Sequence, residues 1–335
     1  MLYNEDVHLI IGSEILNFFN GKGESIDTRL IEHIIKIADE KSITKAAEQL
    51  FLTQSALNQQ LLKLERDLGT ELFVRSKSDW RPTKAGEIYL EGAKEMLRIK
   101  RQTYTSISDV TDSYKGTLTV GMTPFRGPDM FIHVYPMIHE KYPNLVIIPY
   151  ELNVYKMQSL VASGVLDIGF MTLFDEQKQE NEYDNLFEEE IVIATPKSLN
   201  LKNVEYNKES KYPCISLQEI KNQPFIFLRK STTMRPVVDK IFRNEKVVPK
   251  ILFDTANPST ILEMVRAGLC CGVIAETTTK KYQEGINYYS FRSPVKWHMM
   301  VSYEKGTELS KAAKLFIQTA HSYWVNTLVS KGISK

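Results

Sequence analysis

Leucines recur at intervals of four, three and four residues within the stretch 42–69, a spacing that places them on one face of a helix. The members of this apolar face are Leu57, Leu61, Leu64 and Leu68. Thr53 suits the start of the helix, because its hydroxyl can accept hydrogen bonds from free backbone N–H groups. Gly69 suits the end, because glycine tolerates the left-handed backbone conformation found there. The pattern therefore predicts a helix over 54–68, preceded across a tight turn by a shorter helix.

The side of this helix away from the leucines carries hydroxyl, amide and cationic groups. Amides can pair with adenine edges and hydroxyls with several bases, so such a face suits the major groove of DNA. Amphipathic helix pairs are also common as plain core packing, and periodicity alone leaves both interpretations open. Under the DNA-binding interpretation, the predicted contacts on this helix are Thr53, Gln54, Ser55, Asn58, Gln59 and Lys63.

Further elements are predicted on both sides of the helix pair. Apolar residues at positions 31, 34, 35 and 38 predict an earlier helix over 28–40, which completes a three-helix core. Two short extended segments, 72–75 and 80–81, flank a polar turn and predict a two-stranded wing. Charged turns are often only solvated, but beside a DNA-reading helix their cations lie where phosphates run. The predicted phosphate contacts are Arg75, Lys77 and Arg81.

Several residue runs between positions 46 and 86 carry a resemblance to a known family. These runs are Ala46-Ala47-Glu48-Gln49-Leu50, Thr53-Gln54-Ser55-Ala56-Leu57, Leu64-Glu65, Leu68-Gly69, Leu72-Phe73, Arg75 and Thr83-x-Ala85-Gly86. In this order and spacing they resemble the N-terminal signature of the LysR-type transcriptional regulators. The resemblance implies an α+β multidomain fold: an N-terminal winged helix-turn-helix, a long linker helix and a C-terminal two-lobed α/β effector domain like periplasmic binding proteins. It also implies a sequence-specific DNA-binding regulator whose DNA contacts are modulated by a small metabolite bound between the two lobes.

A heptad-like repeat runs through the stretch 83–112 and predicts one long helix, with an interruption at Lys100. Such a seam suits a partner helix in a dimer, although a helix lying on its own domain has the same pattern. The family resemblance implies the dimer, with two DNA-binding heads spaced along the DNA. The predicted dimerisation residues are Tyr89, Ala93, Met96, Thr103, Ile107 and Val110.

After residue 116 short apolar strands alternate with helices, which is typical of an α/β domain. Strands are predicted near 118–122, 145–150, 166–170, 187–195, 223–228, 251–255, 271–274 and 297–303. The run Ile261-Leu262-Glu263-Met264-Val265-x-Ala267-Gly268 continues the family resemblance. The predicted organisation is an N-terminal extension (1–25), a winged helix-turn-helix domain (26–86), a linker and dimerisation helix (87–115) and an effector-binding domain (116–335), with lobe I at 116–193 and 297–335 and lobe II at 194–296.

Ligands of such sheets bind beyond the carboxyl ends of the strands, so the loops at those ends supply the candidate effector contacts. Helix starts offer free N–H groups that favour carboxylates or phosphates, and two arginines lie in these loops, so one hypothesis is an anionic small-molecule effector. The same Ser, Thr and Asn residues can equally be helix caps and turn formers. The candidates are Thr123, Phe125, Arg126, Thr172, Arg229, Ser231, Thr232, Asn257 and Ser259.

Charge changes this picture in one respect. The 335 residues carry a net charge of +1, and the stretch 26–86, with ten Lys and Arg against nine Asp and Glu, also carries only +1. A single DNA-binding head is therefore expected to bind weakly. Two or four heads would multiply the phosphate contacts, so we expect a homodimer or homotetramer.

Composition excludes several classes of protein and of functional site. The three cysteines, Cys214, Cys270 and Cys271, are too few for a disulfide framework and suit a reducing cytoplasm. Without an apolar run of eighteen residues, no transmembrane helix and no membrane partner are expected. The histidines show no metal-ligand spacing, and no nucleophile elbow or phosphate-cradling loop occurs, so we expect no metal, no cofactor, no catalytic residue and no enzyme. The expected partners are double-stranded DNA, the effector and RNA polymerase.

Two other functions stay open at this point. One is a constitutive DNA-binding regulator whose C-terminal domain only oligomerises, which a ligand titration would separate from the effector-modulated regulator. The other is a two-lobed metabolic enzyme with a helical appendage, which would need an ionisable constellation in the crevice that the sequence does not indicate.

Overall fold

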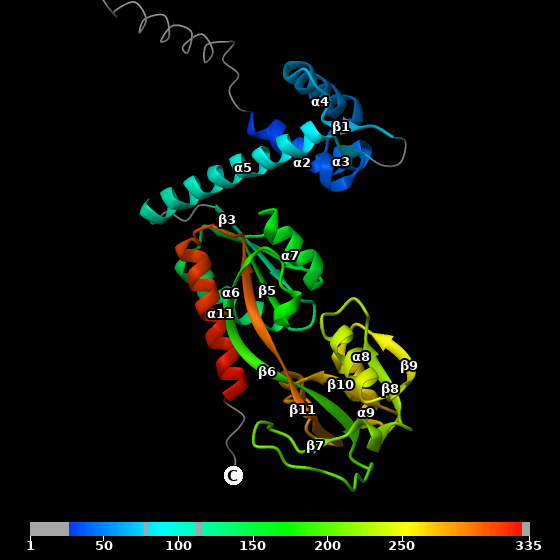
Figure 1. Cartoon of the computed structure of the whole chain (residues 1–335). Coiled ribbons are helices and arrows are strands. Elements are labelled where there is room, and N and C mark those ends of the chain that lie inside the picture. Colours follow the sequence, from blue (N-terminus) through cyan, green and yellow to red (C-terminus); the bar gives the residue numbers. More distant parts are fainter. Residues whose placement is uncertain (1–26, 77–79, 112–115, 330–335) are drawn as a thin grey trace, which may run out of the picture. The chain divides into compact units, whose positions relative to one another are not determined.

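The computed structural model describes residues 27–76, 80–111 and 116–329 (Figure 1). The chain divides into two compact units, the first ending at Thr103 and the second beginning at Tyr104.

The first unit is a three-helix core followed by a two-stranded wing and a long helix. Its elements are α2 (Thr28–Glu40), α3 (Ile43–Gln49), α4 (Gln54–Leu68), β1 (Phe73–Val74), β2 (Arg81–Pro82) and α5 (Lys84–Thr111), of which α5 continues into the second unit. The hydroxyl of Thr53 accepts a hydrogen bond from Ala56 N at 3.2 Å and caps α4, while Gly69 ends the helix with a φ of 68°. Both predicted helix ends are thus confirmed.

The predicted leucine face of α4 needs one correction. Leu57 and Leu61 are completely buried and Leu64 is half-buried, but Leu68 is 47% exposed. The helix ends at Gly69, so its last turn extends past the core formed by α2 and α3. Beyond Leu61, the buried residue of α4 is a charged one, Glu65.

A tight junction holds the wing against the start of α5. The Thr83 hydroxyl accepts a hydrogen bond from Gly86 N at 3.0 Å and donates one to the Glu71 carbonyl at 2.7 Å. Gly86 is required by space, because a Cβ at this position would lie 2.0 Å from the carbonyl oxygen of Leu72. The Thr83-x-Ala85-Gly86 motif therefore joins the linker helix rigidly to the wing.

The second unit is built on a nine-stranded sheet in the described residues, with strand order β4-β3-β5-β11-β6-β10-β8-β9 and β7 beside β11. The strands are β3 (Gly116–Met122), β4 (Leu145–Glu151), β5 (Ile168–Leu173), β6 (Glu182–Pro196), β7 (Cys214–Ile215), β8 (Pro224–Leu228), β9 (Lys250–Thr255), β10 (Cys271–Ala275) and β11 (Ile286–Tyr303). The helices are α6 (Gly127–Lys141), α7 (Val154–Ala162), α8 (Met234–Asn244), α9 (Pro258–Arg266), α10 (Glu276–Thr279) and α11 (Lys311–Val329), with short 3-10 turns η1 (Asp175–Gln177) and η2 (Leu217–Ile220).

Two long antiparallel strands join the two halves of this sheet. β6 and β11 pair along nearly their whole length, from Ile286 opposite Pro196 to Tyr303 opposite Glu182. On one side β3, β4 and β5 are mutually parallel, and on the other β8, β9 and β10 are too. The strands predicted near 187–195 and 297–303 are present within β6 and β11, but both strands are longer than expected, and β7 and α10 were not predicted.

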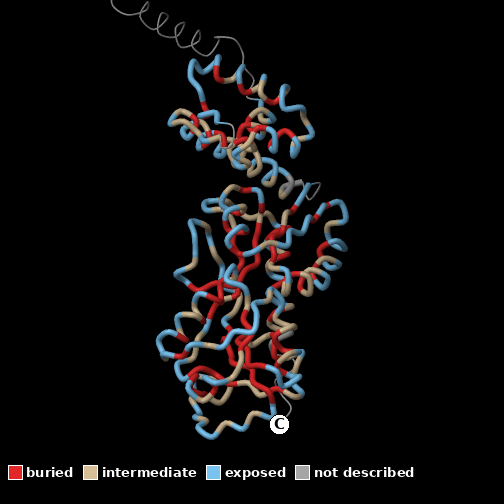
Figure 2. Tube along the Cα trace, turned by 90° about the vertical axis from the view of Figure 1, so that its right-hand side faces the viewer, coloured by how far each residue is buried: buried red, intermediate tan, exposed pale blue. Residues whose placement is uncertain are grey.

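Helices cover both faces of the sheet in each half. Successive residues of a strand point to opposite faces, and here both sets of side chains are apolar and need cover. In the first half, Phe170 of β5 packs with α6 and α11, whereas the next residue, Met171, packs with α7. Figure 1 shows α6 and α11 side by side. Buried residues follow the central strands in Figure 2, with exposed ones along the outer surfaces.

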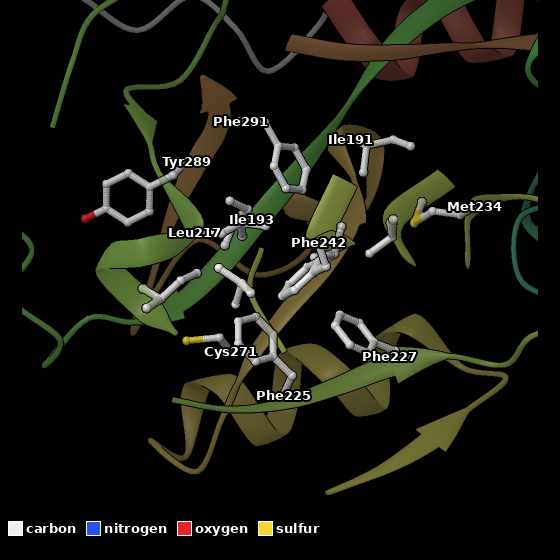
Figure 3. Packing of buried hydrophobic residues seen from close by; sticks show 14 of the residues in the cluster. Ile191, Ile193, Leu217, Phe225, Phe227, Met234, Phe242, Cys271, Tyr289 and Phe291 are labelled. Carbon is white, nitrogen blue, oxygen red and sulfur yellow. The ribbon is translucent and has the colours of Figure 1, made fainter. Parts of the chain in front are cut away.

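The core of the second half is rich in aromatic side chains (Figure 3). Phe242 of α8 meets Phe225 and Phe227 of β8 edge-on, with ring centroids 5.2 and 5.3 Å apart. Ile226 of the same strand points to the opposite face, where α9 packs. In the part of the chain that the structure describes, no helix has the length and apolar character needed to cross a bilayer.

Candidate nucleic-acid interface and effector site

The N-terminal half of α4 presents the predicted base-reading residues at the surface. Thr53, Gln54, Ser55 and Gln59 are exposed and Asn58 is half-buried. The Gln54 side-chain oxygen accepts a hydrogen bond from the Thr44 hydroxyl of α3 at 3.1 Å. The amide that is predicted to read a base is therefore oriented by the preceding helix. Lys63, two turns further along α4, is also exposed.

The wing is organised around an ion pair that the sequence did not reveal. Arg75 binds the buried carboxylate of Glu65, which also accepts a hydrogen bond from Leu72 N at 2.8 Å. The Arg75 guanidinium lies over the ring of Trp80, 5.8 Å from its centroid. Trp80 N in turn donates to the carbonyl of Lys41 at 3.1 Å.

This arrangement changes the interpretation of the predicted phosphate contacts. The charge of Arg75 is neutralised within its own unit, so Arg75 primarily fixes the wing on α4. Arg81 of β2 is exposed, and Lys77 lies outside the described residues. The sequence carried one signal for the burial of Glu65, because Glu65 follows Leu61 by one helical turn and so lies on the same face of α4.

The predicted dimer seam on α5 also needs correction. Ala93 is fully buried within the first unit, and Tyr89 packs against the same core. Lys100 donates to the Thr28 hydroxyl at 2.9 Å and lies 3.6 Å from the Glu32 carboxylate, both on α2. The first part of the seam therefore faces the chain's own helices, which was the alternative interpretation of the repeat. Met96 is half-buried and Thr103 exposed, and the Val110 side chain lies outside the described residues.

A different face of α5 is exposed and apolar. Ile88 is 64% exposed and Ile99, three turns later, is 52% exposed. Gly92 lies between them on the same face. Ile107, a member of the predicted seam, is itself 56% exposed. The face defined by Ile88, Gly92 and Ile99 is called the α5 stripe.

Arg126, at the start of α6, is the centre of the polar network in the second unit. Its guanidinium lies 2.5 Å from the Glu189 carboxylate, donates to the Thr277 hydroxyl at 2.7 Å and to the Thr172 hydroxyl at 3.3 Å, and lies over the Trp297 ring. Glu189 is 3% exposed. The positive charge predicted to attract an anion is thus matched by a carboxylate from β6.

Thr172 connects the two halves of the sheet. Its hydroxyl contacts Arg126 from the first half, and its carbonyl accepts a hydrogen bond from the Thr233 hydroxyl at the start of α8, at 2.9 Å. Gln177 donates to the Thr233 carbonyl at 2.8 Å. Side chains from the starts of α6 and α8 therefore both contact Thr172. Thr123 and Phe125, in the loop before α6, are half-buried, and the ammonium of Lys281 lies 5.9 Å from the Phe125 ring.

The helix starts around this point differ in how they are capped. Asn257 caps α9 by accepting a hydrogen bond from Ser259 N at 2.9 Å, so these two predicted contacts form a cap. Among the described side chains, none caps the start of α6 or of α8. Arg229 and Ser231 are exposed in the loop before α8, and the Thr232 hydroxyl donates to the Arg229 carbonyl at 2.9 Å.

The cysteines lie in the interior. Burial raises the pKa of Cys270 to about 11 and that of Cys271 to about 12, so both remain thiols at neutral pH. Cys214 is also buried. Within residues 27–76, 80–111 and 116–329, no three His, Cys, Asp or Glu side chains are grouped in a way that would hold a metal ion.

Comparison with known proteins agrees with this architecture. The chain is 24% identical to YcgK, an HTH-type transcriptional regulator of Bacillus subtilis, over 88% of this chain and 93% of the relative. It is 27% identical to YwbI of the same organism, over 92% of this chain and all of the relative. A full-length OxyR variant from Pseudomonas aeruginosa has the same fold, with a TM-score of 0.61 and 19% identity over 89% of this chain and 98% of that one.

Two family models match the sequence. The model described as Bacterial regulatory helix-turn-helix protein, lysR family, matches residues 28–87, which hold the three-helix core and the wing. The model described as LysR substrate binding domain matches residues 111–324, well over half of the chain. The chain therefore belongs to the LysR family of DNA-binding transcriptional regulators, in which a helix-turn-helix head precedes an effector-binding domain.

Proposed function

We propose that this regulator reads DNA with the N-terminal half of α4 and anchors on phosphates through Lys63, Lys77 and Arg81. The supporting observation is the row of exposed Thr53, Gln54, Ser55 and Gln59 at the start of α4, beside half-buried Asn58. Recognition helices contact base edges with their N-terminal residues, whereas cations along the helix and wing contact the backbone. Arg75 acts indirectly in this proposal, since its guanidinium holds the wing on Glu65.

Replacing Lys63 by Ala is expected to weaken binding to all DNA sequences alike. Each lost phosphate contact makes the negative slope of log K against log salt less steep by about 0.9. Fluorescence anisotropy at several salt concentrations measures this slope. Lys240→Ala, at an exposed position on α8, is the control for an equal loss of charge elsewhere in the chain. A slope for Lys63→Ala equal to that of the control would contradict the phosphate contact.

We also infer a domain organisation and an assembly. The domains are a helix-turn-helix head at 26–86, a linker helix at 87–115 and an effector-binding domain at 116–335, whose lobe I is 116–193 and 297–335 and whose lobe II is 194–296; residues 1–25 lie outside the described part. The α5 stripe supplies a dimer contact. The edge strands β4 and β9 carry further exposed apolar side chains, which supports a second contact and a tetramer. These side chains are Val146, Ile148, Tyr150, Ile251, Leu252 and Phe253.

The effector in our proposal is a small anion held beside Thr172, near the starts of α6 and α8. The carrying observation is that both helices begin without a side-chain cap among the described residues, while α7 and α9 are each capped by an asparagine. Uncapped N–H groups and the positive end of the helix dipole favour a carboxylate or phosphate. Arg229 and Ser231, in the loop before α8, would complete the site. A ligand bound there would affect both halves of the sheet, because Thr172 contacts Arg126 in one half and Thr233 in the other.

A thermal-shift series with acetate, succinate, citrate and inorganic phosphate tests this assignment on the full-length protein. We expect at least one of these anions to raise the midpoint of unfolding in a saturable way, and Arg229→Ala to weaken that effect. Binding at one hundred times the dissociation constant would stabilise the protein by about 2.7 kcal/mol. Lys230→Ala, the exposed neighbour in the same loop, is the matched control. Equal responses of the two variants would contradict the role of Arg229.

The remaining parts of the proposal follow from the role of the protein as a transcriptional regulator. We infer that the chain is not an enzyme, that it works in the cytoplasm where its DNA lies, and that RNA polymerase is a partner at the promoter. A footprint of polymerase on the operator that does not change when this protein is added would contradict the last inference.

A further inference from the structure

Phe51, in the turn between α3 and α4, is an unusual residue for its position. It is 96% exposed, and its φ of 56° lies in the left-handed region. Most non-glycine residues avoid this region, and asparagine and glycine enter it most readily. A large apolar side chain is thus placed in water on a backbone that does not favour it.

The backbone at Phe51 has a clear structural purpose that the side chain does not share. Phe51 N donates to the Glu48 carbonyl at 3.2 Å and Leu52 N donates to the Ala47 carbonyl at 2.9 Å, which together close the C-terminal end of α3. This pair of bonds is the Schellman arrangement, and its left-handed residue is usually glycine. Leu52, the next residue, packs against the three-helix core, whereas the Phe51 ring leaves the core entirely. Neither the turn nor the core therefore explains a phenylalanine here.

The position of Phe51 along the chain indicates what the ring meets. Thr53, which caps α4, is two residues away, and the exposed Gln54 and Ser55 follow at once. An apolar ring beside a face that enters the major groove meets one apolar group on the base edges, the 5-methyl of thymine. We propose that Phe51 is a specificity-determining residue whose ring packs on the methyl group of a thymine in the operator. This proposal rests on the DNA-binding role of α4.

The test begins with an operator selected from a random DNA library by the full-length protein. Each thymine is then replaced in turn by deoxyuridine, which lacks only the methyl group, and binding is measured by fluorescence anisotropy. At one position the loss of a methyl group buried against the ring is expected to weaken the wild type about fourfold, the fold-change equivalent to about 0.8 kcal/mol.

The variant Phe51→Asn isolates the ring from the backbone. Because asparagine accepts the left-handed conformation, the variant is expected to unfold at the same temperature as the wild type or higher. It should bind the thymine and deoxyuridine operators equally well, with an unchanged salt slope because no charge is lost. Leu68→Ala, at the opposite end of α4, is the control and should keep the wild-type sensitivity to deoxyuridine.

The outcomes are separable. Failure to select any operator would contradict the DNA-binding role itself. A selected operator that the wild type and Phe51→Asn bind equally tightly, with no deoxyuridine position that distinguishes them, would overturn the assignment of Phe51 alone. A loss of affinity in Phe51→Asn that no deoxyuridine position reproduces would place the ring on another group and would also overturn the thymine contact.

Discussion

Replacing Glu189 by Gln is expected to destabilise the protein by roughly 3–5 kcal/mol, because it leaves the Arg126 guanidinium in the interior without its counter-charge. Glu189 accepts hydrogen bonds from three other groups as well: Trp297 Nε1 at 3.0 Å, Thr277 N at 3.1 Å and the Thr277 hydroxyl at 2.8 Å. Gln retains the shape but replaces one acceptor oxygen by an amide donor. Urea unfolding of the full-length protein, followed by tryptophan fluorescence, measures the loss.

The preceding residue provides a matched control. Glu188 lies on the same strand and pairs with Lys296 at 3.1 Å, but both side chains are more than two-fifths exposed. Exposed pairs contribute about 0–1 kcal/mol, so Glu188→Gln should change the free energy of unfolding little. Equal effects of the two variants would refute the buried pair. Removing both partners, in an Arg126→Met and Glu189→Leu double variant, should restore part of the stability.

Introducing a glutamate at Ile99 is expected to split the dimer proposed above. Ile99 belongs to the α5 stripe, and a carboxylate there would have to be desolvated in the proposed contact. The sedimentation mass should fall by half. Operator affinity should fall by a factor of about 10² or more, since two linked heads gain that much over one.

The control for Ile99→Glu is Lys94→Glu on another face of the same helix, where the lysine is exposed. Repulsion between the new carboxylate and the DNA phosphates could also lower the operator affinity. In that case Lys94→Glu would lower it more than Ile99→Glu does, because Lys94→Glu changes the charge by two. An unchanged mass for Ile99→Glu would show that the α5 stripe is not the contact between copies.

The helix-turn-helix head was the part of the fold most accessible to sequence reasoning. Thr53 and Gly69 mark the two ends of α4 by local backbone chemistry, and the structure has both ends there. Apolar alternation also located the strands of the second unit, except β7. Local signals of this kind depend on hydrogen bonds and side-chain periods within a few residues, so they survive without knowledge of the tertiary contacts.

The candidate sites were harder to predict because their decisive contacts join distant residues. Arg126 looked like a free anion-binding cation, but its partners include Glu189 and Thr277, the latter 151 residues further along the chain. Arg75 was predicted to contact a phosphate, and its pairing with Glu65, ten residues away, was not predicted. Periodicity likewise placed Ala93 on a seam but could not say whether a second copy or the chain's own first unit buries it.

By itself, then, the sequence determined the order of the domains, the ends of the principal helices and the family, because each depends on local patterns or on a motif. Only the tertiary structure decided which charges are already paired, which face of α5 is left exposed and which helix starts lack a cap. The physical reason is that the availability of a charged or apolar group depends on what packs against it, and in this protein those neighbours come from elements far apart in the chain.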